Sequence, residues 1–363
     1  MQEIKSIIEE YENINLNQEK VALAVVVNVE ESSYRRIGAR MLVRSNGQWV
    51  GGISGGCLEG DALKRSLHAI HQNKSSKVVY DTLEEDENQI GVGLGCNGKI
   101  EVVFTPIDLA DLQNEIHILK KIVDTDRDIV LLRVIESEDP HTLGKLVLED
   151  HLQANAFDGI DIVALKSIIE KVKAAGRSYI QNFLLDNGSN IRILFELIRP
   201  EIKLLIIGDN YDVTAMVGLA NQLAWKIIIA GDIRKLSKEI VANVFKVFPY
   251  TEIKNISIDQ HTAVVLLSHD YSTDKAALPI LLTKKPRYLG MLGPKKRLHK
   301  MEDSLGNYNF SKIGFFYSPV GFDIGAETPS EIALSILTEI LAVFRDKKGM
   351  HLRNKQGSIH ERK

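Results

Sequence analysis

Residues 51–60, with the sequence GGISGGCLEG, place five glycines and one of the chain's two cysteines within ten positions. A glycine inside a helix or strand costs roughly 0.5–1 kcal/mol relative to alanine. A run this dense therefore predicts a loop whose backbone takes positive φ or approaches another group closely. The fold must be arranged around this loop, because regular elements have to lead into it and out of it.

The flanking residues predict those elements. Residues 21–27 and 41–50 are strand-like, and Asn46-Gly47 is typical of a tight hairpin whose second strand leads directly into the loop. After the loop, apolar residues recur at helical spacing over residues 58–70. Cys57 is therefore expected at or just before the N-terminus of a helix.

A second glycine-rich stretch holds the other cysteine. Residues 91–98, with the sequence GVGLGCNG, contain Cys96. They follow an acidic run at residues 84–87 and precede strand-like residues 100–104. The sequence therefore predicts that both cysteines lie in glycine-rich loops.

The pattern changes at Pro200. Residues 202–208 form an apolar run that ends in glycine, and apolar strands alternate with helices from there. This alternation predicts a parallel sheet with helices on both faces. We therefore expect an α/β chain: residues 1–199 form a mixed α+β domain with the cysteine loops, and residues 200–345 form a Rossmann-like, doubly wound domain. The basic residues 346–363 lack periodicity and are expected to be a poorly ordered tail.

Composition excludes several classes of protein. The 363 residues carry a formal net charge of −3, so neither nucleic acid nor an anionic membrane is expected as a partner. The apolar runs are too short to span a bilayer and the first residues do not resemble a signal peptide, so we expect a cytoplasmic protein. Two cysteines in so long a chain do not form a disulfide framework.

Cys57 is the first candidate for chemistry. A thiol at a helix N-terminus is stabilised as the thiolate by the helix macrodipole. The free amides near Gly55 and Gly56 can bind an anion such as phosphate. With Cys96 in a matching turn, we interpret the pair as sulfur chemistry beside a bound phosphate. The alternative is that each cysteine packs as a core residue.

Two other interpretations of the same residues are weaker. A structural zinc site needs four ligands, whereas the two cysteines are 39 positions apart (96 − 57 = 39), so no metal site is predicted. Residues 52–56 also fit the G-x-S-x-G pattern of a serine hydrolase. That pattern requires a central parallel strand before the serine, whereas here the strand is half of a hairpin.

The second domain begins with a turn that departs from dinucleotide-binding folds. Gly208 opens that turn, and Asp232 follows 24 positions later (232 − 208 = 24), where an acid would bind a ribose hydroxyl. Asp209 and Asp212 put carboxylates where the pyrophosphate would lie. Each like-charge pair costs on the order of 1–4 kcal/mol at about 4 Å. Tight binding of NAD(P) or FAD is therefore not expected.

Two more turns of the second domain are candidates for ligand contacts. Gly293 and Lys295 lie in a basic turn at a predicted helix start, which suits an anion. His269-Asp270 follows a predicted strand, at the sheet edge where ligands of α/β folds bind. A solvated helix start and a hydrogen-bonded turn remain the structural alternatives.

Taken together, these segments resemble the XdhC/CoxI family, the accessory factors of xanthine dehydrogenase and related molybdenum hydroxylases. The matching motifs occur in the family order over about residues 20–345. They are residues 32–41, 54–60 (SGGCLEG), 93–98 (GLGCNG), 288–293 (YLGMLG) and 319–331. Tyr34 and Asn97 stand where proline and glycine are usual, and Asp209-Asn210 replaces part of the usual glycine-rich turn.

The resemblance implies a function and a set of site residues. Such a protein binds the molybdenum cofactor (molybdopterin), helps it to acquire its terminal sulfur and delivers it to an apo-enzyme. On this basis Cys57 and Cys96 contact the metal or relay sulfur. The implied cofactor-binding residues are Arg35, Arg36, Arg40, Ser54, Gly55, Gly56, Glu59, Gly95, Asn97 and Gly98, with Gly208, Asp232, Gly293 and Lys295 as candidates in the second domain.

The resemblance also implies partners: an apo molybdenum hydroxylase, a cysteine desulfurase and a second copy of the chain in a homodimer. A maturation factor is expected rather than a stand-alone enzyme. One Cys₄ iron–sulfur cluster needs four cysteines and the chain has two, so it is not itself the multi-cluster hydroxylase. Two alternatives stay open: an NAD(P)-dependent oxidoreductase that uses Asp232 and the region of His269, and a scaffold that docks partner proteins without its cysteines.

Overall fold

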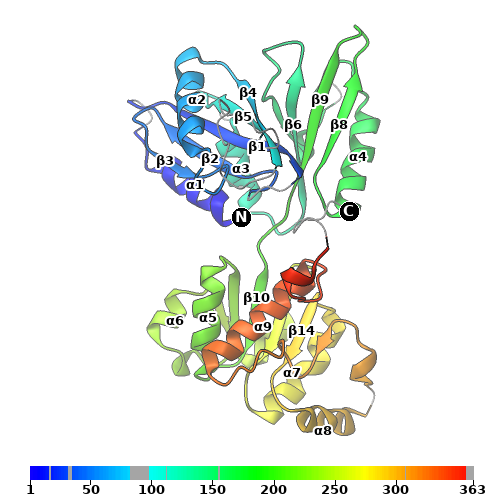
Figure 1. Cartoon of the computed structure of the whole chain (residues 1–363). Coiled ribbons are helices and arrows are strands. Elements are labelled where there is room, and N and C mark those ends of the chain that lie inside the picture. Colours follow the sequence, from blue (N-terminus) through cyan, green and yellow to red (C-terminus); the bar gives the residue numbers. More distant parts are fainter. Residues whose placement is uncertain are drawn as a thin grey trace. The chain divides into compact units, whose positions relative to one another are not determined.

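The computed structural model describes residues 1–15, 18–31, 35–81, 98–111, 113–153, 156–306 and 308–356. By their contacts these residues form two compact units, one up to Pro200 together with Gln356 and the other from Glu201 to Lys355 (Figure 1). The first unit contains two antiparallel sheets, and the second contains one parallel sheet.

The first sheet has five strands in the order β3-β2-β1-β5-β4. They are β1 (Val21–Glu31), β2 (Arg40–Arg44), β3 (Trp49–Gly51), β4 (Ser76–Asp81) and β5 (Gly98–Pro106). Helix α1 (Gln2–Glu12) precedes the sheet, and helix α2 (Glu59–Gln72) follows β3. The central strand β1 is an almost continuous apolar run because both of its faces are covered.

The second sheet has four strands in the order β7-β6-β9-β8. They are β6 (Ile129–Ser137), β7 (Leu146–Leu148), β8 (Tyr179–Leu184) and β9 (Asn190–Ile198). Helix α3 (Glu115–Val123) precedes β6, and helix α4 (Ile162–Ala175) precedes β8. A turn at Asp186-Asn187-Gly188 joins β8 to β9.

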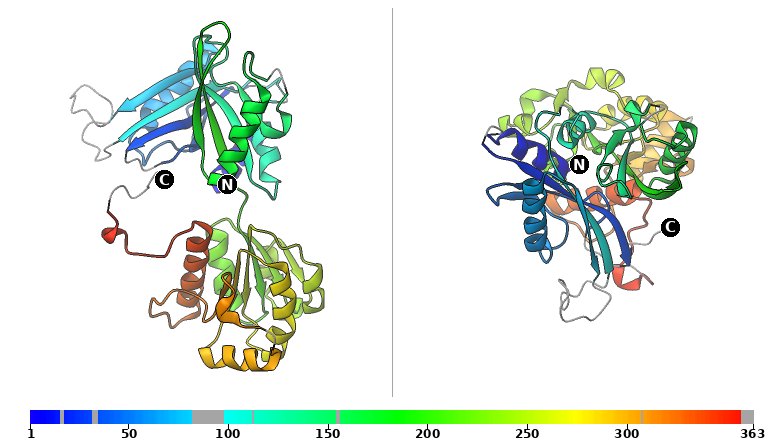
Figure 2. Two further views of the ribbon diagram at one scale, coloured as in Figure 1. Left: turned by 90° about the vertical axis from the view of Figure 1, so that its right-hand side faces the viewer. Right: turned by 90° about the horizontal axis from the view of Figure 1, so that it is seen from above.

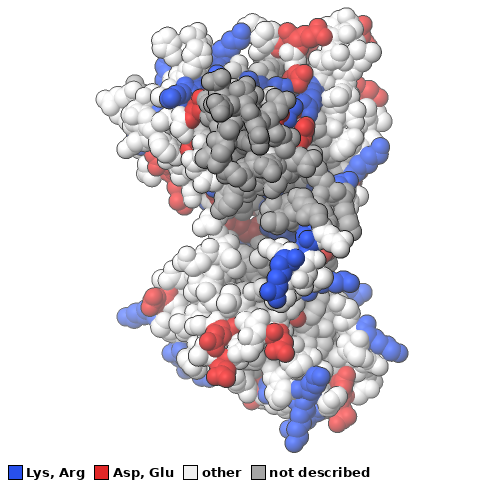
Figure 3. Space-filling view, in the orientation of Figure 1, with Lys and Arg blue, Asp and Glu red and all other residues white. Residues whose placement is uncertain are grey.

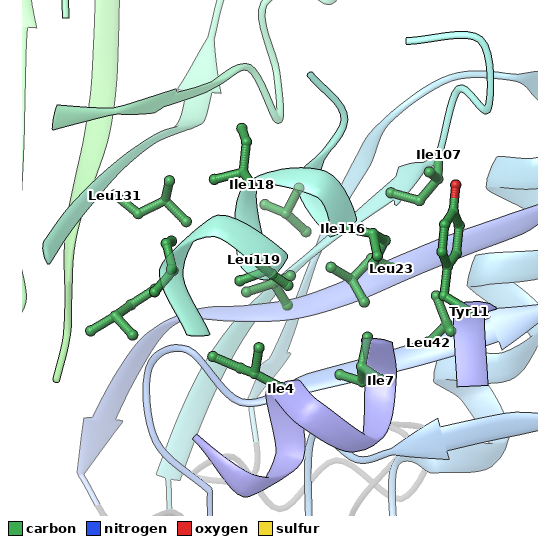
Figure 4. Close-up of a cluster of buried hydrophobic side chains, with 14 of the residues drawn as sticks. Ile4, Ile7, Tyr11, Leu23, Leu42, Ile107, Ile116, Ile118, Leu119 and Leu131 are labelled. Carbon is green, nitrogen blue, oxygen red and sulfur yellow. The ribbon is translucent and has the colours of Figure 1, made fainter. Parts of the chain in front are cut away.

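The two sheets share a core. Alternate residues of β1, including Leu23, point into it, where they meet α1 and α3. Figure 4 shows Ile4 and Ile7 of α1 and Leu119 of α3 in this cluster. Helix α2 covers the other face of the first sheet, and α4 covers the other face of the second (Figures 1 and 2). The first unit is therefore layered as helix, sheet, two helices, sheet and helix.

Four buried charges join the two sheets across this core. Arg40, at the start of β2, is only 1% exposed and donates to both carboxylate oxygens of Glu196 in β9, at 2.7 and 2.8 Å. It also donates to Glu115 of α3 at 3.3 Å, and Arg133 of β6 donates to the same Glu115 oxygen. Burial acts to lower the pKa of Arg40, but the attraction of Glu196 and Glu115 outweighs burial and raises it. The two arginines and two glutamates therefore compensate one another in the interior.

The second unit has six strands, all parallel, in the order β12-β11-β10-β13-β14-β15. They are β10 (Lys203–Ile207), β11 (Lys226–Ala230), β12 (Lys246–Phe248), β13 (Thr262–Leu266), β14 (Tyr288–Met291) and β15 (Phe316–Tyr317). The helices are α5 (Asp212–Gln222), α6 (Lys238–Ala242), α7 (Tyr271–Lys284), α8 (Lys295–Leu305) and α9 (Pro329–Phe344). This strand order is that of dinucleotide-binding Rossmann folds.

The helices of the second unit cover both faces of its sheet. Helices α5, α6 and α9 pack on one face, and α7 and α8 pack on the other. Thr328 caps α9: its hydroxyl accepts the amide of Glu331, and the Glu331 carboxylate accepts the amide of Thr328. The sheet is therefore doubly wound.

The predicted fold class is confirmed in both parts of the chain. The apolar run at residues 202–208 contains β10, and the helix expected from residue 58 is α2. The second antiparallel sheet was not predicted, because residues 105–199 gave only an undivided mixture of helical and strand patterns. Cys96, with Gly95 and Asn97, lies outside the described residues, so the loop predicted there is not tested.

Charges are mixed on the surface. On the face shown in Figure 3, lysine and arginine side chains are interspersed with aspartate and glutamate. Of the helices in the described ranges, none is both long and apolar enough to cross a membrane.

Candidate functional site

The loop after β3 leaves the sheet in close contact with the neighbouring strand. Gly51 has a φ of +80°, and a Cβ there would lie 2.3 Å from the carbonyl oxygen of Arg40. The amide of Gly52 donates to the same carbonyl at 2.8 Å. The group that the chain approaches closely at Gly51 is therefore its own backbone, and this requires glycine.

The hydroxyl of Ser54 organises the loop. Its Oγ accepts the amides of Gly56 at 3.2 Å and Leu58 at 3.0 Å, and it donates to Oε2 of Glu59 at 2.5 Å. The amide of Ser54 donates to Oε1 of Glu59 at 2.8 Å. Burial acts to raise the pKa of Glu59, but the hydrogen bonds from Ser54 outweigh it, so the pKa is lowered and the carboxylate is ionised at neutral pH.

Cys57 lies on this framework, two residues before α2 begins. Its side chain is partly exposed, and its Sγ lies 3.4 Å from Oγ of Ser54. Because Ser54 donates its own proton to Glu59, the thiol is the donor to Ser54. Cys57, Ser54 and Glu59 thus form a chain of hydrogen bonds from a thiol to an ionised carboxylate, at the positive end of the α2 dipole.

Arg35 closes the loop from the side of α1. Its Nε donates to the carbonyl of Ser54 at 3.3 Å, and its Nη1 pairs with Glu3 at 2.7 Å. The side chain is still 37% exposed, so part of the guanidinium faces solvent. Arg36 is exposed, as are Gly55 and Gly56. Arg35 therefore lies at an accessible part of the cysteine loop, and Arg36 is exposed next to it in the chain.

Arg40 has different surroundings. Its donors are taken by Glu196, Glu115 and the carbonyl of Gly38, the last at 2.6 Å. A phosphate-binding role does not fit a guanidinium that is buried and already paired with two carboxylates. Arg40 is instead a structural residue that joins the two sheets, and it lies outside the candidate site.

The segment that carries Cys96 leaves the first sheet beside α2. It departs after Asp81, the last residue of β4, and returns at Gly98, the first residue of β5. The hydroxyl of Tyr80 donates to Oδ2 of Asp61, in the first turn of α2, at 2.8 Å. Burial, followed by the hydrogen bond to Asp61, raises the pKa of Tyr80. The end of β4 is therefore fixed to the same helix turn that follows Cys57.

In the second unit, Gly208 lies where β10 meets β13, the point at which ligands of such sheets bind. A Cβ at Gly208 would lie 2.7 Å from the carbonyl oxygen of Leu267, so contact with neighbouring backbone explains this glycine. Asp209 is buried and accepts the amide of Asp232 at 2.9 Å and the ammonium of Lys235 at 3.4 Å.

Asp212 and His269 meet across the same crevice. Nε2 of His269 lies 2.6 Å from Oδ2 of Asp212, in the first turn of α5, where a pyrophosphate would bind. Asp232 pairs with Arg234 at 2.7 Å, and the hydrogen bonds from Arg234 lower the pKa of Asp232 to about 2. Side chains of the protein itself thus pair with one another at this edge of the sheet.

The pairing of Asp212 with His269 was not predicted. The two residues are 57 positions apart, and the sequence around each one carries no sign of the other. The available signal is topological: in this strand order, the residues after β10 and after β13 lie at adjacent strand ends.

The turn before α8 is built around Arg297. Gly293 has a φ of +131°, and a Cβ there would lie 2.7 Å from Cδ of Arg297. Arg297 pairs with the buried Asp274 at 2.6 Å. Lys295 is exposed at the start of α8, whose first turn has no side-chain cap. These residues belong to the second unit, whereas Cys57 belongs to the first.

An open cleft of about 660 Å³ lies at the ends of β6, β8 and β9. Its lining is polar and includes Glu136, Asn182 and Arg192, but none of the residues predicted for the site. Within the described ranges, no group of three or more histidine, cysteine, aspartate or glutamate side chains is placed to hold a metal ion.

Comparison with known proteins identifies relatives over most of the chain. Residues 16–81 match the XdhC and CoxI family, and residues 204–340 match the XdhC Rossmann domain. The chain is 30% identical over 336 residues to a Bacillus subtilis protein named as a probable subunit of xanthine dehydrogenase, and the match covers 90% of this chain and 93% of that protein. It is 24% identical over 325 residues to the Escherichia coli molybdenum cofactor insertion chaperone PaoD, covering 88% of this chain and 82% of that one.

The fold is also found among solved structures, of which we describe one. It is a Bacillus halodurans protein described as a xanthine dehydrogenase, with a TM-score of 0.71 and 24% sequence identity. The match covers 94% of this chain and 97% of the other.

Proposed function

Because the chain belongs to the XdhC and CoxI family, we propose that it is an accessory factor of a molybdenum hydroxylase of the xanthine dehydrogenase type. In this role it binds the molybdenum cofactor, assists its sulfuration and inserts it into the hydroxylase. The observation that carries the proposal is the partly exposed thiol of Cys57 at the start of α2, beside Arg35. The names of two relatives, an insertion chaperone and a probable component of xanthine dehydrogenase, support it.

The cofactor is the cargo, and its two ends call for different groups. Molybdenum and its terminal sulfur suit a soft sulfur ligand, which Cys57 provides. The pterin phosphate suits guanidinium groups and exposed backbone amides, which Arg35, Arg36 and Gly55 provide.

We assign Ser54 and Glu59 to holding the thiol in place rather than to the phosphate. The amides of Ser54, Gly56 and Leu58 already donate to Ser54 or Glu59. A ligand anion would therefore have to displace the Glu59 carboxylate to reach the amide of Ser54, and the Ser54 hydroxyl to reach those of Gly56 and Leu58.

We assign Cys96, with Gly95, Asn97 and Gly98, to the same site. The support is the hydrogen bond from Tyr80 of β4 to Asp61 in the first turn of α2. The segment that carries Cys96 begins directly after Asp81, the next residue and the last of β4. Both cysteines would then act on one cofactor.

The test is to purify the full chain from a host that makes the cofactor and to measure oxidised pterin by its fluorescence. The wild-type chain is expected to carry pterin, and Cys57→Ala and Cys96→Ala to lose it. Arg65→Ala, an exposed change on α2, is the matched control. A wild-type chain without pterin, whose behaviour neither cysteine substitution changes, contradicts the proposal.

An NAD(P)-dependent oxidoreductase is the alternative, favoured by the strand order of the second unit. The Asp212–His269 pair weighs against it, because it lies where the pyrophosphate would bind. Titration with NAD(H) and NADP(H) separates the two functions. Absence of binding at millimolar concentration excludes the oxidoreductase.

We further propose that the partners are an apo molybdenum hydroxylase and a cysteine desulfurase, that they meet this chain in the cytoplasm, and that the chain is a homodimer. Co-purification tests the first two. A Cys57→Ala, Cys96→Ala double variant that loses pterin is still expected to bind the hydroxylase. If the cysteines prove dispensable for maturation while the hydroxylase still co-purifies, a scaffold is the better description.

A further inference from the structure

Strand β8 is an exposed edge of the second sheet. It has the sequence YIQNFL and lies at the end of the order β7-β6-β9-β8. It contains no charge and no proline, the features that commonly protect an edge strand from pairing. Tyr179 and Leu184 are 50% and 71% exposed. An edge of this kind is a template for another strand.

The hydrogen bonds to β9 determine which groups of β8 are available. The amide of Leu185 donates to the carbonyl of Ser189 at 2.9 Å, so Leu185 and the alternate residues before it face β9. In an antiparallel ladder the residues between them face the other way. The residues that direct N–H and C=O away from the sheet are Ile180, Asn182 and Leu184. The side chain of Gln181 donates to the carbonyl of Asn182 at 2.8 Å, as an outward carbonyl allows.

We propose that β8 pairs antiparallel with β8 of a second copy of this chain, around a two-fold axis at Asn182. In this register Asn182 lies opposite its counterpart, and Ile180 lies opposite Leu184 in both directions. The three outward residues of each copy then form about six hydrogen bonds across the axis. The two four-stranded sheets then form one continuous sheet, which runs from β7 of one copy to β7 of the other.

The side chains fit this register. Leu184 comes opposite Ile180, and Tyr179 comes opposite Leu185, so each exposed apolar residue gains an apolar partner. Arg177 and Asp186, both exposed, lie two residues before and two residues after the strand. Antiparallel self-pairing therefore brings a basic end beside an acidic end at both ends of the interface. This self-complementarity selects a second copy as the partner.

The interface is small. Pairing of two short strands buries less than the roughly 1,200–2,000 Å² of a typical stable complex. We therefore expect a reversible dimer with a dissociation constant of about 1–100 µM. This gives the proposed homodimer a specific surface, and it does not depend on the cofactor.

The test uses analytical ultracentrifugation of the full chain over a concentration series. Asn182→Asp and Asn182→Lys each put like charges opposite one another at the axis and are expected to weaken the dimer at least about tenfold. Both should leave the fold intact, because Asn182 is exposed. Mixing the two variants pairs opposite charges and should restore a dimer. Asn255→Asp, the same change at an exposed position of the second unit, is the matched control.

A disulfide provides a second measurement. Facing residues that exchange both hydrogen bonds have Cα atoms about 5.5 Å apart, within disulfide range. Asn182→Cys, in a chain with both native cysteines changed to serine, is expected to form a covalent dimer on oxidation, whereas Asn187→Cys is not. A wild-type chain that stays monomeric, or an Asn182→Asp variant that dimerises as tightly as wild type, overturns the proposal. So does a monomeric chain whose β8 accepts a strand of another protein.

Discussion

Glu59 places an ionised carboxylate two hydrogen bonds from the Cys57 thiol, through the hydroxyl of Ser54. A negative charge at Glu59 opposes a second negative charge on the sulfur, whereas the positive end of the α2 dipole favours one. Glu59→Gln separates the two effects, because it removes only the carboxylate charge.

Replacing Glu59 by glutamine should make Cys57 more reactive. We expect Glu59→Gln to increase the rate of alkylation by iodoacetamide at pH 7 about five- to tenfold, because the opposing charge is removed. The measurement is made with Cys96→Ser, so that Cys57 is the single thiol. Asp61→Asn is the control, since Arg65 already compensates the Asp61 carboxylate. Slower alkylation in Glu59→Gln would contradict this electrostatic account.

Arg40 should be essential to stability. Arg40→Met leaves Glu196 buried without its bidentate partner, so we expect a loss of about 3–5 kcal/mol in the free energy of unfolding, measured by urea denaturation. Arg65→Met removes an exposed ion pair within α2 and should cost less than about 1 kcal/mol. Equal midpoints for the two variants would show that the buried network contributes nothing.

Among the elements, those with a strong local pattern were predictable. The continuous apolar runs predicted β1 and β10, Asn46-Gly47 predicted the hairpin before the loop, and helical spacing predicted α2 after Cys57. The family was also predictable, because its motifs are short segments in a fixed order. Each of these signals can be read within a window of about 10–20 residues.

The contacts between elements could not be predicted in this way. Arg40 meets Glu196 at a separation of 156 positions, so the sequence around Arg40 carries no sign of its partner. The position of Arg40 near a glycine-rich loop suggested that its guanidinium binds a phosphate. In the structure the guanidinium N–H groups donate to Glu196 instead. The Ser54–Glu59 bonds are local, but they depend on loop dihedrals that glycine leaves open.

A second charged group between the two sheets makes stability depend on pH. Glu101 of β5 is held by Asn28 of β1, Lys77 of β4 and Arg192 of β9. Burial acts to raise the pKa of Glu101, but these partners outweigh it and the pKa is lowered. A lowered folded-state pKa means that the stabilisation is present above about pH 4.5 and is lost as the pH falls below that value.

The free energy of unfolding should therefore fall below about pH 4.5, and it should fall less steeply in Glu101→Gln than in wild type. The measurement is urea denaturation over a pH series. Glu9→Gln, at an exposed position of α1, is the control and should leave the slope close to that of wild type. A slope for Glu101→Gln as steep as that of wild type contradicts the assignment.

At the scale of the whole molecule, the two units divide the candidate chemistry. The first unit carries Cys57 and both ends of the Cys96 segment, whereas the second has a Rossmann sheet edge at which Asp212 and His269 pair with each other. Each cluster of buried apolar residues in the described ranges also lies within one unit. The hydrophobic contribution to stability is therefore separate for the two units.

Separate cores predict separate unfolding. Leu131→Ala opens a cavity in the core between the two antiparallel sheets, and Ile206→Ala opens one in the Rossmann sheet; each should cost about 2–5 kcal/mol. In differential scanning calorimetry we expect two transitions, with Leu131→Ala lowering the Tm of one and Ile206→Ala lowering the Tm of the other. Leu334→Ala, at an exposed position of α9, should lower neither by more than about 2 °C. A single transition that both core substitutions lower equally would mean that the units unfold together, and the stability of the cysteine site would then depend on the Rossmann unit as well.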